Sequence, residues 1–226
     1  HKPKLQHKHN MSSNVDYQEI HLTEKYNHPF FFPKDGLYTN ERKSLWRTIS
    51  NAILSGKVDK IYNDANPNFT ELFDKETYLK RLENRDGPEV VPLKSMDITS
   101  YKIKGIWYVD KRIGEMRYRL LGIMPRGKDM NNLANDEPVD LFWLWYKDLR
   151  PILHAQLVFD DRNNASRVTF DQLLTSRRFT ARIYALDNVF NDRPVDQYVD
   201  DPFMQLIESE RLKNVIRDFE QDLWSN

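Results

Sequence analysis

The stretch that decides the fold is Tyr101-Lys-Ile-Lys-Gly-Ile-Trp-Tyr-Val-Asp-Lys-Arg-Ile-Gly-Glu-Met-Arg-Tyr-Arg-Leu-Leu-Gly-Ile-Met124. Its two halves each alternate in hydropathy, and Asp110-Lys-Arg-Ile-Gly114 between them is typical of a turn. Alternation with a period of two is typical of a β-strand with one buried face. The stretch therefore predicts a β-hairpin, whose inward residues are Tyr101, Ile103, Trp107 and Val109 on one strand and Met116, Tyr118, Leu120 and Met124 on the other.

Three more strands are expected on the C-terminal side of this hairpin. Residues 141–146, Leu-Phe-Trp-Leu-Trp-Tyr, are apolar on both faces, which predicts a central strand buried on both sides. Residues 152–159 follow so closely that a hairpin turn at 148–151 is the economical connection. Residues 179–186 form the fifth strand, after a short helix whose capping box pairs Thr169 with Gln172.

Helices are expected on the N-terminal side. Residues 40–55 place apolar side chains at helical spacing, and Gly56 follows as a stop. A shorter helix is expected over 75–83, with Asp74 as its cap. Residues 17–33 predict an irregular segment that packs across a core, and residues 85–92 a linker. The apolar face of the first helix consists of Leu45, Trp46, Ile49, Ala52 and Ile53.

The C-terminal residues 200–226 predict an amphipathic helix, with Asp201 as its cap and Pro202 in its first turn. Its end at Trp224 indicates a terminus docked on the protein's own core or on another protein. The elements together predict an α+β fold, in which an antiparallel sheet of about five strands, built from hairpins, is flanked by N-terminal and C-terminal helices.

The chain is expected to consist of a flexible N-terminal arm and one folded domain. Residues 1–16 are polar and basic, which favours a flexible arm, and a solvated tail is favoured over a metal site at its histidines His1, His7 and His9. Residues 17–226 are expected to form one domain. It divides into a helical part (17–92), a sheet-rich part (93–199) and the C-terminal helix (200–226).

Composition excludes several classes of protein. The 34 basic residues balance the 34 acidic ones, which argues against a nucleic-acid-binding surface. The absence of cysteine excludes disulfides and thiol chemistry. With 7 glycines and no glycine-rich motif, a nucleotide-binding loop is not expected. The sequence has no apolar run long enough to predict a transmembrane helix, and the N-terminus as given does not show the pattern of a signal peptide.

Candidate catalytic residues are few. The acid pairs Asp160-Asp161 and Asp200-Asp201 are more typical of turns and caps than of a glycosidase pair. His154 is expected in mid-strand as a hydrogen-bonded structural residue. A hydrolase would need His154 or His28 close to carboxylates in a concave site.

Aromatic and basic residues of the sheet are the stronger candidates for function. Arg117 and Arg119 are expected on the strand face opposite Tyr118, which indicates a side that faces solvent or a partner. Most aromatic residues of the sheet are expected in the core, although an exposed aromatic face would suit sugars, bases or a protein partner. The predicted partner-binding residues are Arg117, Arg119, Trp107, Tyr108, Asn188, Phe190, Arg193 and Trp224.

Several segments, in order, resemble the GldN/PorN family of the type IX secretion and gliding-motility machinery of Bacteroidota. They are Glu24-Lys-Tyr-Asn-His-Pro-Phe-Phe-Phe-Pro33, Ile106-Trp-Tyr-Val-Asp-Lys-Arg112 with Met116-Arg-Tyr-Arg-Leu-Leu-Gly-Ile123, Leu141-Phe-Trp-Leu-Trp-Tyr-Lys-Asp-Leu-Arg-Pro151, Thr169-Phe-Asp-Gln-Leu-Leu174, Asn188-Val-Phe-Asn-Asp-Arg193, and Leu206-Ile-Glu-Ser-Glu-Arg-Leu-Lys213 running into Phe219-Glu-Gln-Asp-Leu-Trp224.

The resemblance implies a non-enzymatic periplasmic scaffold without a cofactor. Such a subunit would assemble with a GldK/PorK-like lipoprotein into a ring under the outer membrane and contact a GldM/PorM-like periplasmic shaft. The family brings no established catalytic residues to this chain. The alternative, from the residues alone, is a carbohydrate-binding module that uses an aromatic face of the sheet.

Overall fold

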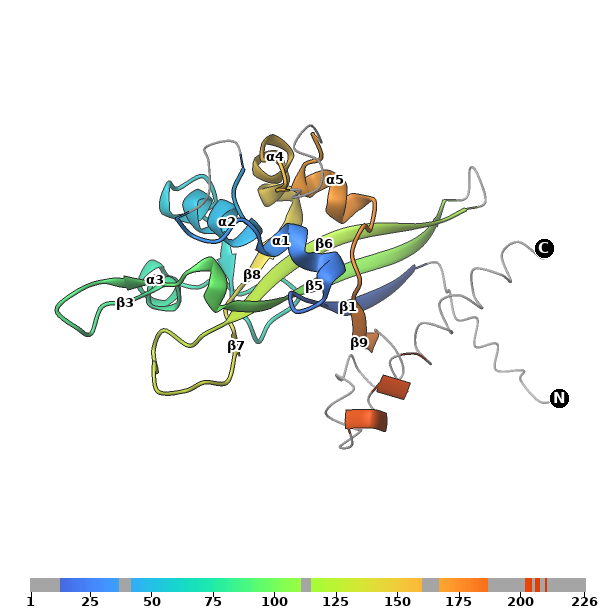
Figure 1. Ribbon diagram of the computed structural model, residues 1–226. Helices are drawn as coiled ribbons and strands as arrows, with labels where there is room; N and C mark the ends of the chain where they lie inside the picture. The colour runs from blue at the N-terminus through green and yellow to red at the C-terminus, as the bar shows by residue number, and fades with distance from the viewer. Residues whose placement is uncertain are drawn as a thin grey trace. The chain divides into compact units, whose positions relative to one another are not determined.

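The computed structural model describes residues 13–36, 42–110, 115–159 and 167–186, together with 202–204, 206, 207 and 210. The chain divides into two compact units. One unit comprises residues 1–16, 105–119 and 183–226, and the other comprises 17–104 and 120–182. Figure 1 labels the elements along the chain.

A seven-stranded sheet is the main β-structure of the described residues. Six of its strands have the order β2-β8-β6-β5-β1-β9, and β7 pairs with β6. The predicted hairpin is confirmed as β5 and β6, and the α+β class is confirmed with it. The strands are β1 (Ser13–His21), β2 (Ile61–Tyr62), β5 (Ile98–Asp110), β6 (Glu115–Gly127), β7 (Val139–Asp140), β8 (Trp143–Trp145) and β9 (Arg182–Leu186).

Strand β1 corrects the prediction of an irregular segment over residues 17–33. It begins at Ser13, inside the expected arm, and its residues 16–20 are all buried. Its polar side chains have partners: Arg177 Nη2 donates to Gln18 Oε1 at 2.9 Å, and Ser100 Oγ donates to Glu19 Oε1 at 2.6 Å. Because buried polar residues interrupt the apolar alternation, the strand lacks the usual sequence pattern.

Helix α4 (Tyr146–Ala155) corrects the predicted strand over residues 152–159. The hairpin turn expected at 148–151 is also wrong, because Pro151 lies inside this helix, on its exposed side. Tyr146, Leu149 and Leu153 are buried at helical spacing. The central strand expected over 141–146 is correspondingly short, since β8 ends at Trp145, although residues 141–144 are buried as expected.

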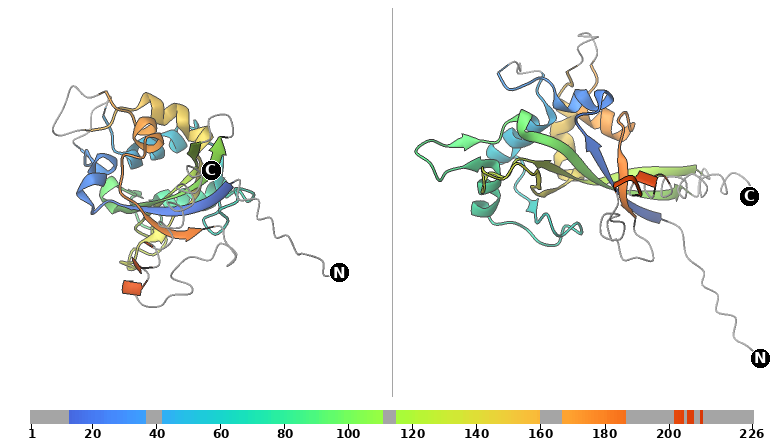
Figure 2. Two further views of the ribbon diagram at one scale, coloured as in Figure 1. Left: turned by 90° about the vertical axis from the view of Figure 1, so that its right-hand side faces the viewer. Right: turned by 60° about the horizontal axis from the view of Figure 1, so that its bottom comes forward.

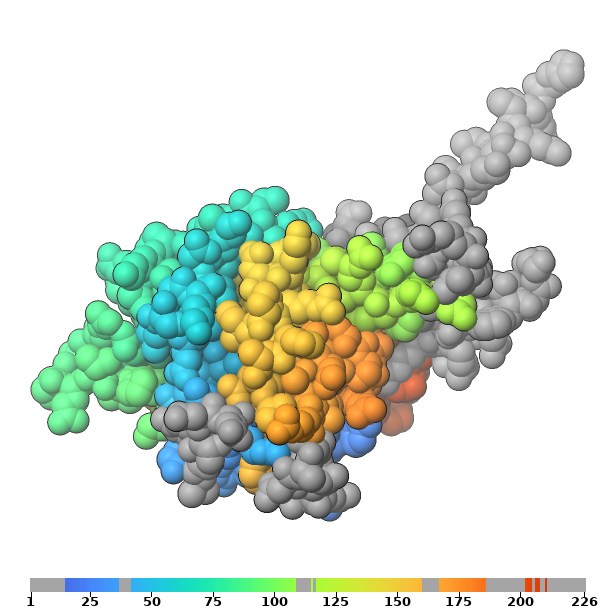
Figure 3. Space-filling model, turned by 90° about the horizontal axis from the view of Figure 1, so that it is seen from above, coloured from blue at the N-terminus to red at the C-terminus, as the bar shows by residue number. Residues whose placement is uncertain are grey.

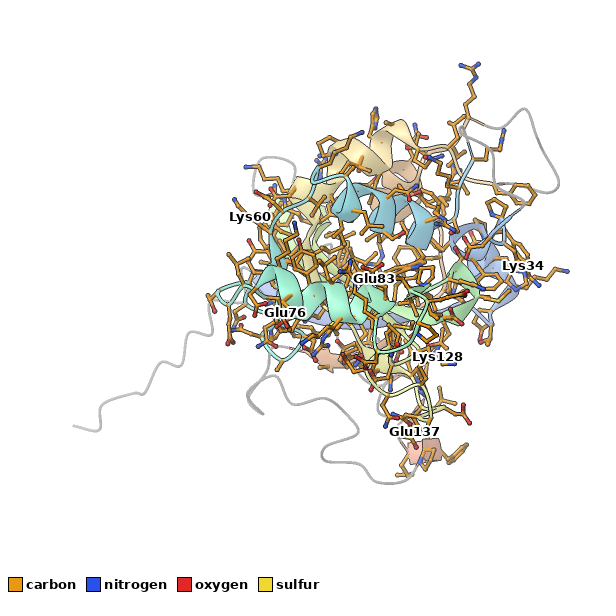
Figure 4. The ribbon with its side chains drawn as sticks, turned by 90° about the vertical axis from the view of Figure 1, so that its left-hand side faces the viewer. Lys34, Lys60, Glu76, Glu83, Lys128 and Glu137 are labelled. Carbon is orange, nitrogen blue, oxygen red and sulfur yellow. The ribbon has the colours of Figure 1, made fainter. Side chains whose placement is uncertain are left out.

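The expected N-terminal helices are confirmed with shorter bounds. Helix α2 (Leu45–Leu54) buries the predicted apolar face and is capped by Ser44 Oγ, which accepts from the Arg47 N–H at 3.2 Å. Helix α3 (Lys75–Leu82) has Asp74 as its cap, as predicted, and Figure 4 looks onto this helix. The linker expected over 85–92 instead ends in a short strand, β4 (Val91–Pro92), which pairs with β3 (Glu83–Asn84) just before the linker.

Helices α1 (His28–Phe31), α2, α4 and α5 (Phe170–Thr175) lie on the same side of the sheet residues of their unit (Figures 1 and 2). Phe30 of α1 joins this layer together, with its ring centroid 6.3 Å from that of Phe170 and 6.2 Å from that of Phe179. The capping box of Thr169 and Gln172 is present at the start of α5. The 3₁₀ helices are Lys25–Asn27 and Ser95–Asp97.

The loop between β2 and α3 is fixed against the sheet at Phe69. This residue has a left-handed backbone (φ 57°), which is unusual for a bulky side chain. Its ring lies over Gly122 of β6, where a Cβ atom would overlap it, and 4.7 Å from the Trp145 ring centroid. The buried Lys104 of β5 donates its Nζ to the Pro67 carbonyl at 3.0 Å and to Asn68 Oδ1 at 3.1 Å. A glycine and a lysine of the sheet therefore position this loop.

Candidate partner-binding surface

Residues 105–119 of the β5–β6 hairpin carry the predicted surface. On one face, the Trp107 Nε1–H donates to Asp16 Oδ2 at 3.0 Å, and the Trp107 and Tyr118 ring centroids lie 5.0 Å apart. Tyr118 lies against the backbone of Gly105, where a Cβ would overlap its ring. Trp107 and Tyr118 are half-buried. This face is thus organised by aromatic packing and one hydrogen bond to a carboxylate.

The opposite face carries the arginines. Arg117 and Arg119 are exposed, whereas Leu120 is buried, as the alternation predicted. The Arg119 guanidinium lies 5.1 Å from the Tyr108 ring centroid, which is a cation–π arrangement. Arg117 Nη2 lies 3.9 Å from Glu115 Oε2, and both side chains are 51% exposed. We call Tyr108, Glu115, Arg117 and Arg119 the arginine face.

The arginine face has the chemistry of a protein-binding surface. A guanidinium can donate two parallel hydrogen bonds to a carboxylate and can also stack on an aromatic ring. The Arg119 guanidinium packs on the Tyr108 ring. The ion pair of Arg117 with Glu115 is exposed to solvent, so it restrains the Arg117 side chain only weakly. Tyrosine and arginine are enriched at the centres of protein interfaces. An acidic or aromatic patch on another protein would complement this face.

The predicted partner-binding residues of the hairpin lie on two opposite faces. Trp107 lies on the face opposite the arginines, with Asp16 and Tyr118, whereas Tyr108 lies with Arg119. Trp107 was predicted on the inward face of the hairpin, and the two-residue period of a strand places the neighbouring Tyr108 on the opposite face. The other predicted residues lie outside the described residues; they are Asn188, Phe190, Arg193 and Trp224.

The sequence analysis missed an apolar cluster in the C-terminal segment. Residues 202–204, 206, 207 and 210 are helical, consistent with the predicted helix there. Phe203 is 68% exposed, and Met204, Leu206 and Ile207 are 45–50% exposed. These apolar side chains lie along one stretch of helix, and none of them was among the predicted partner-binding residues.

The aromatic residues of β8, together with Tyr146 at the start of α4, do not form a sugar-binding face. Trp143 is 2% exposed and Tyr146 is 5% exposed, so neither ring offers a surface for stacking. Trp145 packs edge-on against Phe69. Trp143 and Tyr146 are therefore core residues, as most aromatic residues of the sheet were expected to be.

His154 lies on a helix and not in a strand. Its side chain is 68% exposed, and Nδ1 lies 3.2 Å from Asp171 Oδ2. In the described part of the chain, no serine or threonine hydroxyl is hydrogen-bonded to the imidazole, so the His–Asp pair lacks the nucleophile of a hydrolase triad. Among the same residues, no group of three or more His, Asp or Glu side chains is placed to hold a metal ion.

The helices in the described part of the chain are all too short or too polar to cross a membrane. The fold and the arginine face define an α+β protein that carries an arginine and aromatic surface on a hairpin. A comparison with curated protein sequences finds no significant match.

A family model described as "Gliding motility associated protein GldN" matches residues 5–225, nearly the whole chain. The chain therefore belongs to the GldN family, a component of the gliding-motility and type IX secretion machinery. This family is a structural component of that machinery and is not known as a family of enzymes. The resemblance read from the sequence is confirmed.

Proposed function

We propose that the protein is a non-enzymatic periplasmic scaffold subunit of the type IX secretion and gliding-motility machinery. In this role it assembles with a GldK/PorK-like lipoprotein into a ring beneath the outer membrane, and it contacts a GldM/PorM-like shaft. Family membership supports the place in the machinery. The arginine face of the β5–β6 hairpin is the observation that supports a binding role, because it combines exposed cations with an aromatic support.

Arg117 and Arg119 are the residues of the proposal that are open to direct test. Trp107 stabilises the opposite face of the hairpin through its hydrogen bond to Asp16 and its ring contact with Tyr118. The proposal also includes Asn188, Phe190, Arg193 and Trp224, which rest on the sequence alone. Residues 17–226 are proposed to act as one domain.

Co-expression with the GldK-like lipoprotein tests the proposal. The two proteins should co-purify and elute as one large complex in size-exclusion chromatography with light scattering. The double variant Arg117→Glu/Arg119→Glu should weaken this complex by roughly a hundredfold or more, since reversing two interface cations replaces attraction by repulsion.

The matched control is Lys80→Glu/Arg85→Glu. Arg85 is an exposed arginine that pairs with the acid two residues before it, Glu83, just as Arg117 pairs with Glu115. This control should leave the complex intact. A folded Arg117→Glu/Arg119→Glu protein that still forms the complex would remove the arginine face from the interface, and a wild-type protein that stays monomeric beside its lipoprotein would refute the scaffold proposal.

A further inference from the structure

A second cationic surface lies on α4 and α5, which are side by side on the molecular surface (Figure 3). A shallow hollow of about 350 Å³ opens there, lined by Lys147, Arg150, Pro151, His154 and Asp171. The first four belong to one side of α4, because their spacing of three, four and seven residues places them on one helical face. Asp148, which also belongs to α4, does not line the hollow.

Asp171 of α5 is the anchor of this surface. Its side chain is 6% exposed, and its carboxylate accepts hydrogen bonds from Tyr146 Oη at 2.6 Å and from Arg150 Nε at 3.0 Å. His154 Nδ1 approaches the second oxygen at 3.2 Å. A buried acceptor with three partners fixes the positions of the Arg150 and His154 side chains.

The protonation states of the anchor follow from these contacts. Burial raises the pKa of Asp171, but the hydrogen bonds from Tyr146 and His154 and the charge of Arg150 outweigh it, so the pKa lies below its ordinary value. Burial, together with the bond to Asp171, raises the pKa of the Tyr146 hydroxyl well above its ordinary value. Asp171 therefore stays ionised and Tyr146 stays a donor at neutral pH.

Hydrogen-bond donors remain free around the hollow. Arg150 is 60% exposed and contacts Asp171 through Nε, and its two terminal nitrogens have no hydrogen-bonding partner within the described residues. His154 meets Asp171 through Nδ1, and among the described residues its Nε2 has no hydrogen-bonding partner, on a side chain that is 68% exposed. Lys147 is exposed and has no ion pair within the described residues.

We propose that this surface binds a carboxylate from an acidic segment of a partner protein. Lys147, Arg150 and Asp171, which line the hollow, together carry a net charge of about +1 when all three are ionised. That charge matches a single carboxylate better than a phosphate dianion. The hollow is open and shallow, which suits a side chain or a chain end of another protein, and Pro151 adds an apolar wall for its methylene groups.

This docking surface shares no residue with the arginine face, and it rests on the proposed function only in taking its ligand to be a protein. A direct binding measurement separates the two proposals. Failure of the surface to bind an acidic peptide, in a protein that still assembles with its lipoprotein, would overturn this inference alone.

The test is fluorescence anisotropy of the full chain with a labelled hexaglutamate peptide, beside a hexaglutamine peptide, at low ionic strength. The wild type should bind the acidic peptide and not the neutral one, and binding should weaken as salt is added. Lys147→Ala and Arg150→Gln should each weaken binding by about fivefold to tenfold. Lys147 has no hydrogen bond or ion pair with Asp171, whose partners among the described residues are Tyr146, Arg150 and His154, so its variant tests the surface and keeps those bonds of the anchor.

Lys80→Ala is the control, because Lys80 is an exposed lysine on α3, 59% exposed and paired with Glu76 at 2.8 Å. It should bind the peptide as the wild type does. The inference is overturned if Lys147→Ala binds like the wild type, if Lys80→Ala weakens binding equally, or if the neutral peptide binds as well. Inorganic phosphate that displaces the peptide, while acetate does not, would also overturn it and assign the hollow to a phosphate-bearing ligand.

Discussion

The arginine face of the hairpin and the α4 surface both display cations, but they hold them differently. In the hairpin, Arg119 lies over the Tyr108 ring, and the ion pair of Arg117 is exposed. On α4, Arg150 and His154 converge on the buried carboxylate of Asp171. The contacts that a surface cation makes with its own protein decide how firmly it is positioned. They therefore also decide how much free energy is lost on binding, when the side chain becomes ordered.

The largest effect is expected from removing the anchor. Asp171→Ala should lower the free energy of unfolding by roughly 3 kcal/mol, because it leaves the buried Tyr146 hydroxyl without its acceptor and removes the partner of Arg150. Urea denaturation, monitored by circular dichroism, measures this loss in the free energy of unfolding. The control Asp148→Ala, at the exposed acid in the first turn of α4, should cost at most about 1 kcal/mol. Equal losses in both variants would show that Asp171 does not anchor the surface.

The same anchor predicts a dependence on acid. Since the folded-state pKa of Asp171 is lowered, its contribution is fully present above the unfolded pKa of about 4 and is lost as pH falls through the folded value. The difference in unfolding free energy between wild type and Asp171→Asn should therefore shrink between about pH 6 and about pH 3. Urea titrations at both pH values measure it, and a constant difference would contradict the assigned ionisation.

A smaller coupling is expected between Arg119 and Tyr108. A double-mutant cycle with Arg119→Ala and Tyr108→Ala should give about 0.5–1 kcal/mol, the usual size of a cation–π contact at a surface. Thermal unfolding of the four proteins measures this coupling. A value near zero would mean that Tyr108 does not support the arginine, and the contrast with the α4 surface would become sharper.

The smallest coupling is expected between Arg117 and Glu115. Because both side chains are half exposed and their charges are 3.9 Å apart, the cycle should give less than about 0.5 kcal/mol, and added salt should reduce it. The same denaturation experiments measure it. A coupling above that of Arg119 with Tyr108 would reverse the order proposed for the arginine face.

The hairpin could be predicted from sequence because alternation is a local signal. Tyr101 and Ile103 are buried and Arg117 and Arg119 exposed, as a period of two requires. Helix α4 has an equally local signal, since Tyr146, Leu149 and Leu153 recur at helical spacing. It was missed because Pro151 suggested a turn, although a proline on the exposed side of a helix is tolerated at some cost.

The anchor of the α4 surface was beyond prediction for a different reason. Asp171 meets His154 across 17 positions of sequence, and this contact depends on how two helices pack. Strand β1 was hidden in the same way, because Gln18 and Glu19 find their partners at Arg177 and Ser100, far along the chain. Local patterns reveal elements, whereas buried polar contacts require the tertiary structure.

The contact of Phe69 with Gly122 has a consequence for how this protein can vary. A side chain at position 122 would overlap the Phe69 ring, and the left-handed backbone at Phe69 fixes where that ring lies. Position 122 can therefore accept a side chain only if the ring at position 69 gives way. Within the family, we expect substitutions at Gly122 to appear together with a smaller residue at position 69, so that the two positions covary.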